Sequence, residues 1–401
     1  MTEDNAMPFP VAGARQTGLS RRHFLSGVGA AGAAVASAGL LAGCGNDDTD
    51  ASGETPDQST VDKKLNVANW QLYIDTKRVD GEKTYPTLEA FQTEFGIEVA
   101  YTEPINDNEE YFAKIRPQLA AGNDIGQDLI VMTDWMASNL INIGYLQKLD
   151  KTNIPNLDNI VPKLKSPVFD PNRDYSIPWQ SGVTGIAYDA GQIGEVGSIS
   201  DLLTNPELNG SITVLKEMRD TMGLIMLDQG ANPEEFTEDE WNNAIEALQS
   251  AVDNGQVRQF TGNNYAQLLA KGDLKACIAW SGDVIQLQFD NPDIKFVVPD
   301  AGGMLWSDNM LIPNGVQHKL NAELWMNYYY QPEVAAELAA WVNYICPVVG
   351  AQEIMAKTDK SLAANPLIFP TEEDYAKLSI FRALTDAEAG TFTTQFQALY
   401  T

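Results

Sequence analysis

Strand-like and helix-like segments alternate along the first part of this chain, and that alternation constrains its fold more than any other feature. The segments 64–70, 97–104 and 127–135 have the short apolar or alternating pattern of strands. Apolar residues at helical spacing lie between them, at 85–96 and 107–122, and each of these two segments ends on a glycine, as helices often do. Repeated strand–helix–strand units form a largely parallel sheet with helices on its faces. The sequence therefore predicts an α/β fold.

The chain is long enough to form two lobes. Its 401 residues exceed what one compact core usually holds, and 44% of them are hydrophobic, which is enough to fill two cores. The segment 174–189 is extended and interrupted by Pro178, Gly182 and Gly185, which is typical of a crossover from one lobe to another. Strand and helix patterns resume after it, so the second lobe is also predicted to be α/β.

The N-terminus has the pattern of an export signal. Residues 20–25, SRRHFL, contain paired arginines and precede a weakly apolar run that ends with LAGC at residues 41–44. Paired arginines indicate the twin-arginine route, and LAGC resembles a bacterial lipobox, in which the cysteine is lipidated. We predict a signal peptide over 1–43 and a flexible acidic tether over 44–63. Cys44 would attach the protein to the cell membrane, facing the outside or the periplasm. The alternative is a plain signal peptide in which the cysteine falls by chance.

Net charge and rare residue types exclude several classes of function. The formal net charge is −29, which repels nucleic acid and anionic lipid. Only His318 of the two histidines lies beyond the predicted signal peptide, and we interpret it as a surface residue. A His/Cys zinc cluster is therefore impossible and no Walker-type glycine loop occurs, so we expect no metal and no cofactor. Cys277 and Cys346 could pair in an oxidising compartment, which sequence alone leaves open.

Tryptophan and carboxylate residues follow the predicted strands. Ligands of open α/β sheets bind beyond the carboxyl ends of the strands, so these residues form the candidate site. The predicted ligand-binding residues are Trp70, Gln71, Tyr73, Thr133, Asp134, Trp135, Glu217, Asp220, Trp280, Trp306 and Asp308. Aromatic faces attract cations and cover methylene chains, and carboxylates pair with ammonium groups. The set suits an elongated organic polycation, although a sugar stacked on tryptophan would use the same residue types.

An ordered series of motifs resembles the spermidine/putrescine-binding proteins of ABC importers. The motifs are NWQLYI, AFQTEFGIEV, QDLIVMTDW, YSIPWQSGVTGIAYD, AWSGD and GGMLWSDNMLIP, and they run from about Leu65 to Pro347. The resemblance implies a two-lobed periplasmic-binding-protein-like fold (type II). In that fold each lobe is a mixed, largely parallel sheet flanked by helices, and two crossovers form the hinge. Lobe 1 would comprise 64–183 and 308–354, and lobe 2 would comprise 184–307 and 355–401.

The resemblance also implies roles for the residues of lobe 1 and for the acids of lobe 2. Trp70 and Tyr73 would form an aromatic wall. Thr133 and Trp135 would supply a hydroxyl group and a further aromatic contact. The acids for one amine end of the ligand would be Glu217 and Asp220.

Three further roles follow from the same resemblance. Trp280 would contribute an aromatic contact from the AWSG motif. Trp306 would cover the methylene chain of the ligand, and Asp308 would pair with an amine. Because Trp306 and Asp308 stand two residues apart in a predicted strand, both side chains point to the same face.

The chain departs from the family at two places. Cys346 stands before a proline where relatives often have an aromatic residue, so that wall is missing or replaced by a disulfide between Cys277 and Cys346. Lys216 and Arg219 flank the predicted acids. If either one pointed inward, it would weaken the binding of a polycation or favour a ligand that also carries a carboxylate. The last polar contact would come from Gln395 or Gln397.

These inferences predict a monomeric, lipid-anchored solute receptor with no catalytic activity. It would capture a polyamine, spermidine or putrescine, and deliver it to the permease subunits of an ABC transporter. Within the same class, the alternative ligands are another organic cation and a small sugar. A secreted glycoside hydrolase is the alternative from a different class, because paired carboxylates and tryptophans also line sugar clefts. Another alternative is an adhesin.

Overall fold

The structure is a computed structural model that describes residues 55–79 and 81–401. The predicted signal peptide, Cys44 and the first part of the predicted tether lie outside these residues. Within the described part of the chain, no helix is both long enough and apolar enough to cross a membrane.

Ten strands form one mixed sheet in the order β4-β1-β5-β11-β6-β9-β7-β8, with β10 beside β6 and β12 beside β11. Their bounds are β1 Lys64–Trp70, β4 Glu98–Ile105, β5 Leu129–Thr133, β6 Ser176–Asp189, β7 Ile212–Leu215, β8 Val257–Thr261, β9 Ala276–Trp280, β10 Ile294–Val297, β11 Gly303–Leu311 and β12 Leu378–Ser379. A separate hairpin joins β2 (Lys77–Val79) to β3 (Glu82–Thr84). The neighbours of β1 and of β7 are parallel to them, as the βαβ pattern predicted.

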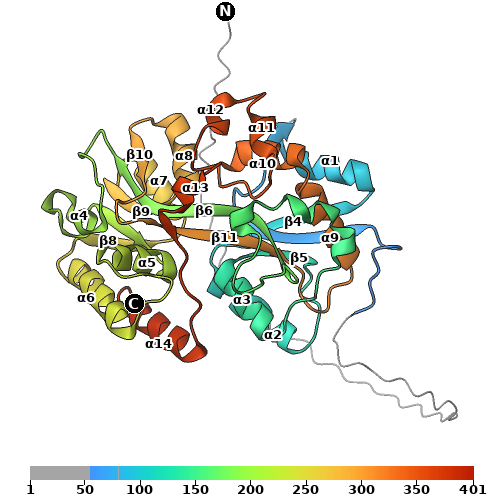
Figure 1. Cartoon of the computed structure of the whole chain (residues 1–401), viewed down its shortest axis with the longest axis horizontal. Helices are drawn as coiled ribbons and strands as arrows, with labels where there is room; N and C mark the ends of the chain where they lie inside the picture. The colour runs from blue at the N-terminus through green and yellow to red at the C-terminus, as the bar shows by residue number, and fades with distance from the viewer. Residues whose placement is uncertain (1–54, 80) are drawn as a thin grey trace, which may run out of the picture. The chain divides into compact units, whose positions relative to one another are not determined.

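The strands β6 and β11 are the two crossovers, and they run side by side between the two groups of helices (Figure 1). They pair antiparallel along most of their length, from Met304 opposite Thr184 to Leu311 opposite Ser176. At one end of this ladder β5 pairs with β11, and at the other end β9 pairs with β6. A single sheet therefore passes through both lobes. The predicted crossover is thus one uninterrupted strand, even though it contains a proline and two glycines.

Separate hydrophobic cores define the two lobes. The core of lobe 1 covers both faces of its part of the sheet, with Val131 on one face and Ile130 on the other. The core of lobe 2 gathers around β7 and β9. Cys346 lies in the first core and Cys277 in the second, and both are buried free thiols, so the disulfide considered from the sequence is absent.

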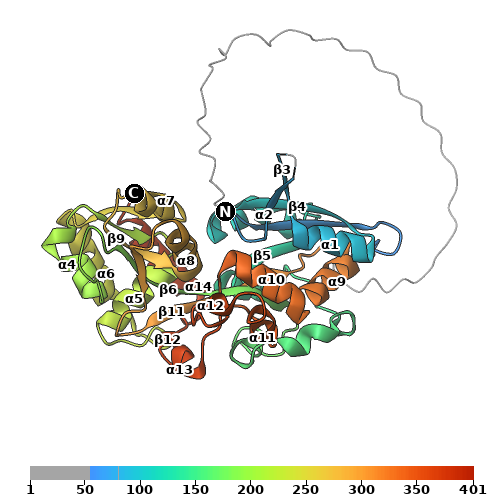
Figure 2. The same cartoon turned by 90° about the horizontal axis from the view of Figure 1, so that it is seen from above.

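The helices fall into two groups that surround the two ends of the sheet (Figure 2). Those of lobe 1 are α1 Pro86–Phe95, α2 Asn108–Ala120, α3 Asp134–Asn142, α9 Lys319–Tyr329, α10 Pro332–Val342, α11 Ala351–Met355 and α12 Lys360–Ala363. Those of lobe 2 are α4 Ile199–Thr204, α5 Met218–Asp228, α6 Glu238–Asp253, α7 Asn264–Ala270, α8 Ser281–Asp290 and α14 Asp386–Gln397. The short α13 (Glu372–Tyr375) lies between α12 and α14 in the chain. The described residues also contain four 3-10 turns: Lys151–Asn153, Pro155–Asn159, Pro162–Leu164 and Pro206–Leu208.

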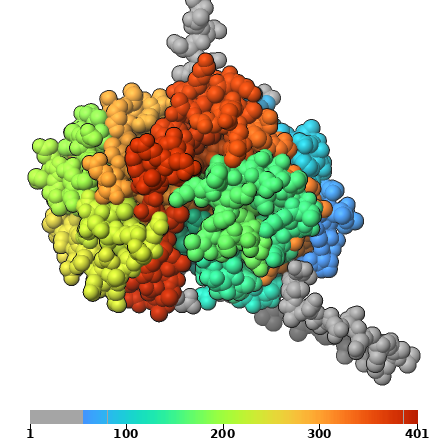
Figure 3. All heavy atoms as spheres, viewed as in Figure 1, coloured from blue at the N-terminus to red at the C-terminus, as the bar shows by residue number. Residues whose placement is uncertain are grey.

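The last part of the chain returns from lobe 1 to lobe 2. Met355 and Ile368 still pack in the first core, whereas Phe392 and Phe396 pack in the second. In the space-filling view, the C-terminal residues, drawn in red, cover the junction of the lobes on the face shown (Figure 3). We propose that the last switch between lobes falls after residue 369, later than the boundary at residue 354 that the sequence suggested.

Residues 57–62, which were expected to belong to the tether, lie against the start of α9. The Gln58 amide donates to the Gln317 carbonyl over 2.7 Å, and Asp57 accepts from the Leu320 amide over 3.2 Å. The interpretation of His318 as a surface residue is wrong, because its ring lies buried between Asp128 and the more exposed Asp62. We propose that the folded body begins near Asp57.

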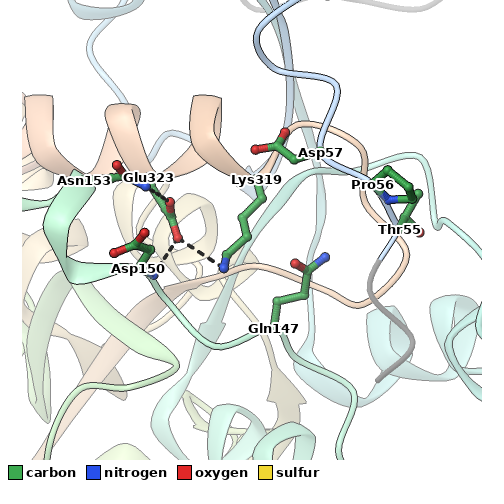
Figure 4. A pocket seen from close by; sticks show the side chains of 8 residues that line it. All are labelled: Thr55, Pro56, Asp57, Gln147, Asp150, Asn153, Lys319 and Glu323. Atoms are coloured by element: carbon green, nitrogen blue, oxygen red, sulfur yellow. Dashed lines mark hydrogen bonds and ion pairs between the residues drawn. The ribbon is translucent and has the colours of Figure 1, made fainter. Parts of the chain in front are cut away.

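A polar pocket of about 360 Å³ lies beside this segment (Figure 4). Glu323 is the buried acid of this pocket, and it accepts from the Asp150 amide over 2.7 Å and from Asn153 Nδ2 over 2.6 Å. Lys319 lies 3.6 Å from the same carboxylate. These groups already satisfy one another, and none of the predicted ligand-binding residues lines the pocket.

The packing of α14 on lobe 2 yields a stability prediction. The ring of Phe392 stacks on Trp241 with centroids 4.2 Å apart, and Trp241 Nε1 donates to Gln395 Oε1 over 2.7 Å. We expect Phe392→Ala to lower the free energy of unfolding by about 3–5 kcal/mol, because it leaves a cavity in the second core. Gln397→Ala removes an exposed side chain of the same helix and should leave the urea midpoint nearly unchanged. Equal midpoints for the two variants would show that α14 does not contribute to the core.

Candidate functional site

Asp308 lies on β11 at the point where the two lobes meet, and hydroxyl groups surround its carboxylate. Tyr73 Oη donates to Oδ2 over 2.9 Å, and Thr133 Oγ1 donates to Oδ1 over 2.7 Å. The register of β5 with β11 places Thr133 directly opposite Asp308. Burial raises the pKa of Asp308 to about 7, although the two hydroxyl hydrogen bonds oppose that rise. The carboxylate is held by neutral donors, and no ion pair to Asp308 occurs among the described residues.

The hydroxyl proton of Thr133 is directed at Asp308 by Asn108. Asn108 Nδ2 donates to Thr133 Oγ1 over 2.9 Å, so the hydroxyl oxygen is already an acceptor and its proton is free for Asp308. The Thr133 amide donates to Asn108 Oδ1 over 3.1 Å, which fixes the amide of Asn108 in this orientation. Asn108 begins α2 and does not directly follow a strand, so the rule that ligands bind at strand ends does not point to it.

Three aromatic rings surround the Asp308 side of the site. The ring of Trp306 lies across Gly182 of β6, where a Cβ atom would overlap it, and its Nε1 donates to Thr184 Oγ1 over 3.0 Å. The ring of Tyr344 is centred 5.6 Å from that of Trp306 and 5.4 Å from that of Tyr73. Tyr344 therefore supplies an aromatic wall only two residues before Cys346, where the sequence suggested that such a wall was missing.

Asp283 holds Tyr344 in place. Its carboxylate accepts from Tyr344 Oη over 2.8 Å, from Tyr265 Oη over 2.7 Å and from Asn263 Nδ2 over 3.1 Å. A Cβ atom at Gly282 would overlap the Tyr344 ring, so the close approach requires glycine. Tyr344 lies in the loop after α10, and no periodic pattern in the sequence marks that loop.

A second carboxylate approaches from lobe 2. Asp220 on α5 accepts from Trp280 Nε1 over 2.7 Å and is buried. Trp280 ends β9 opposite Thr184 of β6, and its ring is centred 6.4 Å from that of Trp306. Burial raises the pKa of Asp220 to about 6, and the hydrogen bond from Trp280 works against that rise. The structure therefore links Asp220, Trp280 and Trp306 in one cluster.

Glu217 and Trp135, by contrast, both contact a protein cation. The guanidinium carbon of Arg219 lies 3.8 Å from the centroid of the Trp135 ring, and Arg219 Nη1 lies 3.9 Å from Glu217 Oε1. Burial raises the pKa of Glu217 to about 8, although the charge of Arg219 lowers it. Because Trp135 belongs to lobe 1 and Arg219 to lobe 2, this contact joins the lobes. Lys216 is exposed, with its Nζ 5.8 Å from the ring centroid of Tyr400.

The other three predicted ligand-binding residues are Asp134, Trp70 and Gln71. Both oxygens of Asp134 accept from β11, one from the Ser307 amide over 3.1 Å and one from Asn309 Nδ2 over 2.7 Å. Trp70 Nε1 donates to the Val131 carbonyl over 3.0 Å, and Gln71 is exposed.

Neither C-terminal glutamine contacts this cluster. Gln395 accepts from Trp241 in lobe 2, and Gln397 is exposed. Among residues 55–79 and 81–401, no group of three or more His, Cys, Asp or Glu side chains is arranged to hold a metal ion.

Solved structures with a similar fold include the "Putative spermidine/putrescine ABC transporter from Listeria monocytogenes". The match has a TM-score of 0.73 at 24% sequence identity and covers 84% of this chain and 98% of that one. The Tp0655 (TpPotD) lipoprotein of Treponema pallidum matches with a TM-score of 0.70 at 20% identity, over 84% of this chain and 99% of that one. These likenesses confirm the predicted two-lobed fold.

Sequence comparison gives the family. The spermidine/putrescine-binding periplasmic protein of Salmonella typhimurium is 28% identical over 280 residues, which are 69% of this chain and 78% of that protein. The putrescine-binding periplasmic protein PotF of Escherichia coli is 26% identical over 336 residues, or 79% of this chain and 85% of that protein. The resemblance stated from the motifs is thereby confirmed.

The family model for the bacterial extracellular solute-binding proteins matches residues 87–370. Proteins of this family bind solutes for transport, so the chain is a binding protein, and the alternative of a glycoside hydrolase does not hold. Because the match covers more than half of its residues, the chain belongs to the bacterial extracellular solute-binding proteins.

Proposed function

We propose that this protein captures a polyamine between its two lobes and delivers it to the permease of an ABC importer. The named relatives that bind spermidine or putrescine support this ligand class. The protein would be a monomer, exported by the twin-arginine route through Arg21 and Arg22 and anchored outside the cell membrane by lipid on Cys44.

The observation that carries the proposal is the environment of Asp308. A buried carboxylate is stable in its charged form only when cations or several donors compensate for the lost hydration. Asp308 has two hydroxyl donors and, within the described residues, no cationic side chain as a partner. A ligand ammonium group would complete this environment.

The neighbouring groups suit the rest of a polyamine. The faces of Trp306 and Tyr344 suit a methylene chain and the cationic groups beside it, at about 0.5–2 kcal/mol per cation–π contact. Asp220 with Trp280 offers a second acidic position in the other lobe. We assign Asp308 and Asp220 to the amines, and Trp280, Trp306, Tyr73 and Tyr344 to the aromatic walls. Asp134 and Trp70 would position β11 and β5.

A thermal-shift measurement tests the ligand class. Putrescine or spermidine at about 100 times its dissociation constant should stabilise the protein by about 2.7 kcal/mol, which raises the melting temperature visibly. Asp308→Asn should abolish that shift, whereas Asp300→Asn, the same charge change at an exposed position, should retain it. A shift with glycine betaine or maltose but with neither polyamine would support a solute-binding function and contradict the assignment of a polyamine as the ligand.

The raised pKa of Asp308 predicts how stability depends on pH. A carboxylate that holds its proton more tightly when folded contributes stability at acidic pH, and loses that contribution as the pH rises toward the folded pKa of about 7. The ligand-free protein should therefore lose stability between about pH 4 and pH 7, and putrescine should stabilise it more as the pH rises. Asp308→Asn should flatten both trends in melting curves. Identical trends in the variant would show that Asp308 does not cause this pH dependence.

The contact between Gly182 and Trp306 gives a test of the aromatic wall. Gly182→Ala should displace the Trp306 ring, because the added methyl group overlaps it, and should weaken polyamine binding by at least about tenfold. Gly197→Ala adds the same methyl group where no atom lies within 4 Å and should bind normally. Titration calorimetry measures both, and normal binding by Gly182→Ala would show that the ligand does not use Trp306.

A further inference from the structure

Arg219 brings a cation of the protein itself into the candidate site. It lies on α5 between Glu217 and Asp220, and its side chain is only 13% exposed. Its guanidinium group stacks on the ring of Trp135, with 3.8 Å from the guanidinium carbon to the ring centroid. One of its nitrogens lies 3.9 Å from a carboxylate oxygen of Glu217. Arg219 therefore contacts an aromatic face and an acid together.

That combination is the one a ligand ammonium group would need. Aromatic faces and carboxylates attract organic cations, and at Trp135 and Glu217 a protein side chain takes both. A ligand cation could bind there only by displacing a guanidinium group that is already stacked and paired. This end of the site is thus occupied by the protein's own charge.

The other two acids of the site differ in this respect. Asp308 accepts from two hydroxyl groups, and Asp220 accepts from the indole nitrogen of Trp280. Neither forms an ion pair among the described residues, although the charge of Arg219 also reaches Asp220. Two acidic positions therefore remain available for ligand cations, and a third is filled.

Several acidic side chains lie near Arg219, and its positive charge offsets their negative charge. Glu109 and Asp107, at the start of α2 in lobe 1, act electrostatically on Glu217 together with Asp220. The charge of Arg219 acts on three of these acids, Glu109, Glu217 and Asp220. Such a cluster would attract a further cation.

We propose that Arg219 is a specificity-determining residue that fills one cation position of the site, so that the protein selects ligands with two ammonium groups over ligands with three. This inference rests on the proposed polyamine binding and narrows it to diamines. Because Trp135 and Arg219 belong to different lobes, the same contact also helps to hold the lobes together.

The test is titration calorimetry of the full chain with putrescine, a diamine, and spermidine, a triamine. The unchanged protein should bind putrescine more tightly. Arg219→Gln should improve spermidine binding relative to putrescine by at least about tenfold, because it opens a third position for a cation. Arg219→Lys keeps the charge and should keep the diamine preference. Lys216→Gln removes a charge three residues away at an exposed position and should leave the ratio unchanged.

Several outcomes would overturn the inference. One is that Arg219→Gln changes the ratio of spermidine affinity to putrescine affinity by less than about twofold. This holds even if both affinities fall, because a merely structural role of Arg219 would weaken both equally. A preference of the unchanged protein for spermidine is another. Circular dichroism checks the folding of each variant, and Arg219→Met provides a second neutral replacement if the glutamine variant does not fold. If the unchanged protein binds neither amine, the proposed polyamine function itself fails.

Discussion

The antiparallel pairing of β6 with β11 is the interaction on which the rest of the structure depends. These strands connect the two lobes within one sheet, so their register fixes residues of both lobes at the same time. At one end of the ladder, β11 sets Asp308 opposite Thr133 of β5. At the other end, β6 sets Thr184 opposite Trp280 of β9, which in turn donates to Asp220. One hydrogen-bonded ladder thus places one donor of each carboxylate, Thr133 for Asp308 and Trp280 for Asp220.

Burial of these carboxylates would make the proposed site responsive to cations. Removing a carboxylate from water costs free energy, and neutral donors offset only part of that cost. The raised pKa values of Asp308 and Asp220 express this cost, because the protein holds protons where an exposed aspartate would not. A cation that entered from solution would relieve it. Arg219 offsets only part of the cost at Glu217, because burial still raises the pKa of Glu217 to about 8. The acids of the site are therefore not equivalent.

The sequence predicted much of the fold because its signals are local. Helix α1 ends at Gly96, which has the left-handed backbone conformation that stops a helix, and the apolar runs became β1, β5 and β9. The rule that ligands bind at strand ends also gathered Asp308, Trp280 and Trp306, which the structure places close together. These inferences needed only spacing and residue type.

The remaining features depend on long-range packing that no local pattern reveals. Tyr344 lies in a loop and joins the aromatic cluster only because Gly282 lets its ring approach. His318 looked exposed in a polar segment, but its carboxylate neighbours Asp62 and Asp128 come from distant parts of the chain. The orientation of the Arg219 side chain depends on its contact with the Trp135 ring in the other lobe. Each of these contacts exists only once the tertiary structure has formed.

Proton release on binding tests whether buried carboxylates with raised pKa values receive a cationic ligand. It can be measured by putrescine titrations in buffers of different ionisation enthalpy. We expect binding at about pH 6.5 to expel protons, because the ligand lowers the pKa of Asp308 and Asp220, and we expect the release to disappear at about pH 9. Binding without proton release at the lower pH, or with proton uptake, would contradict this expectation.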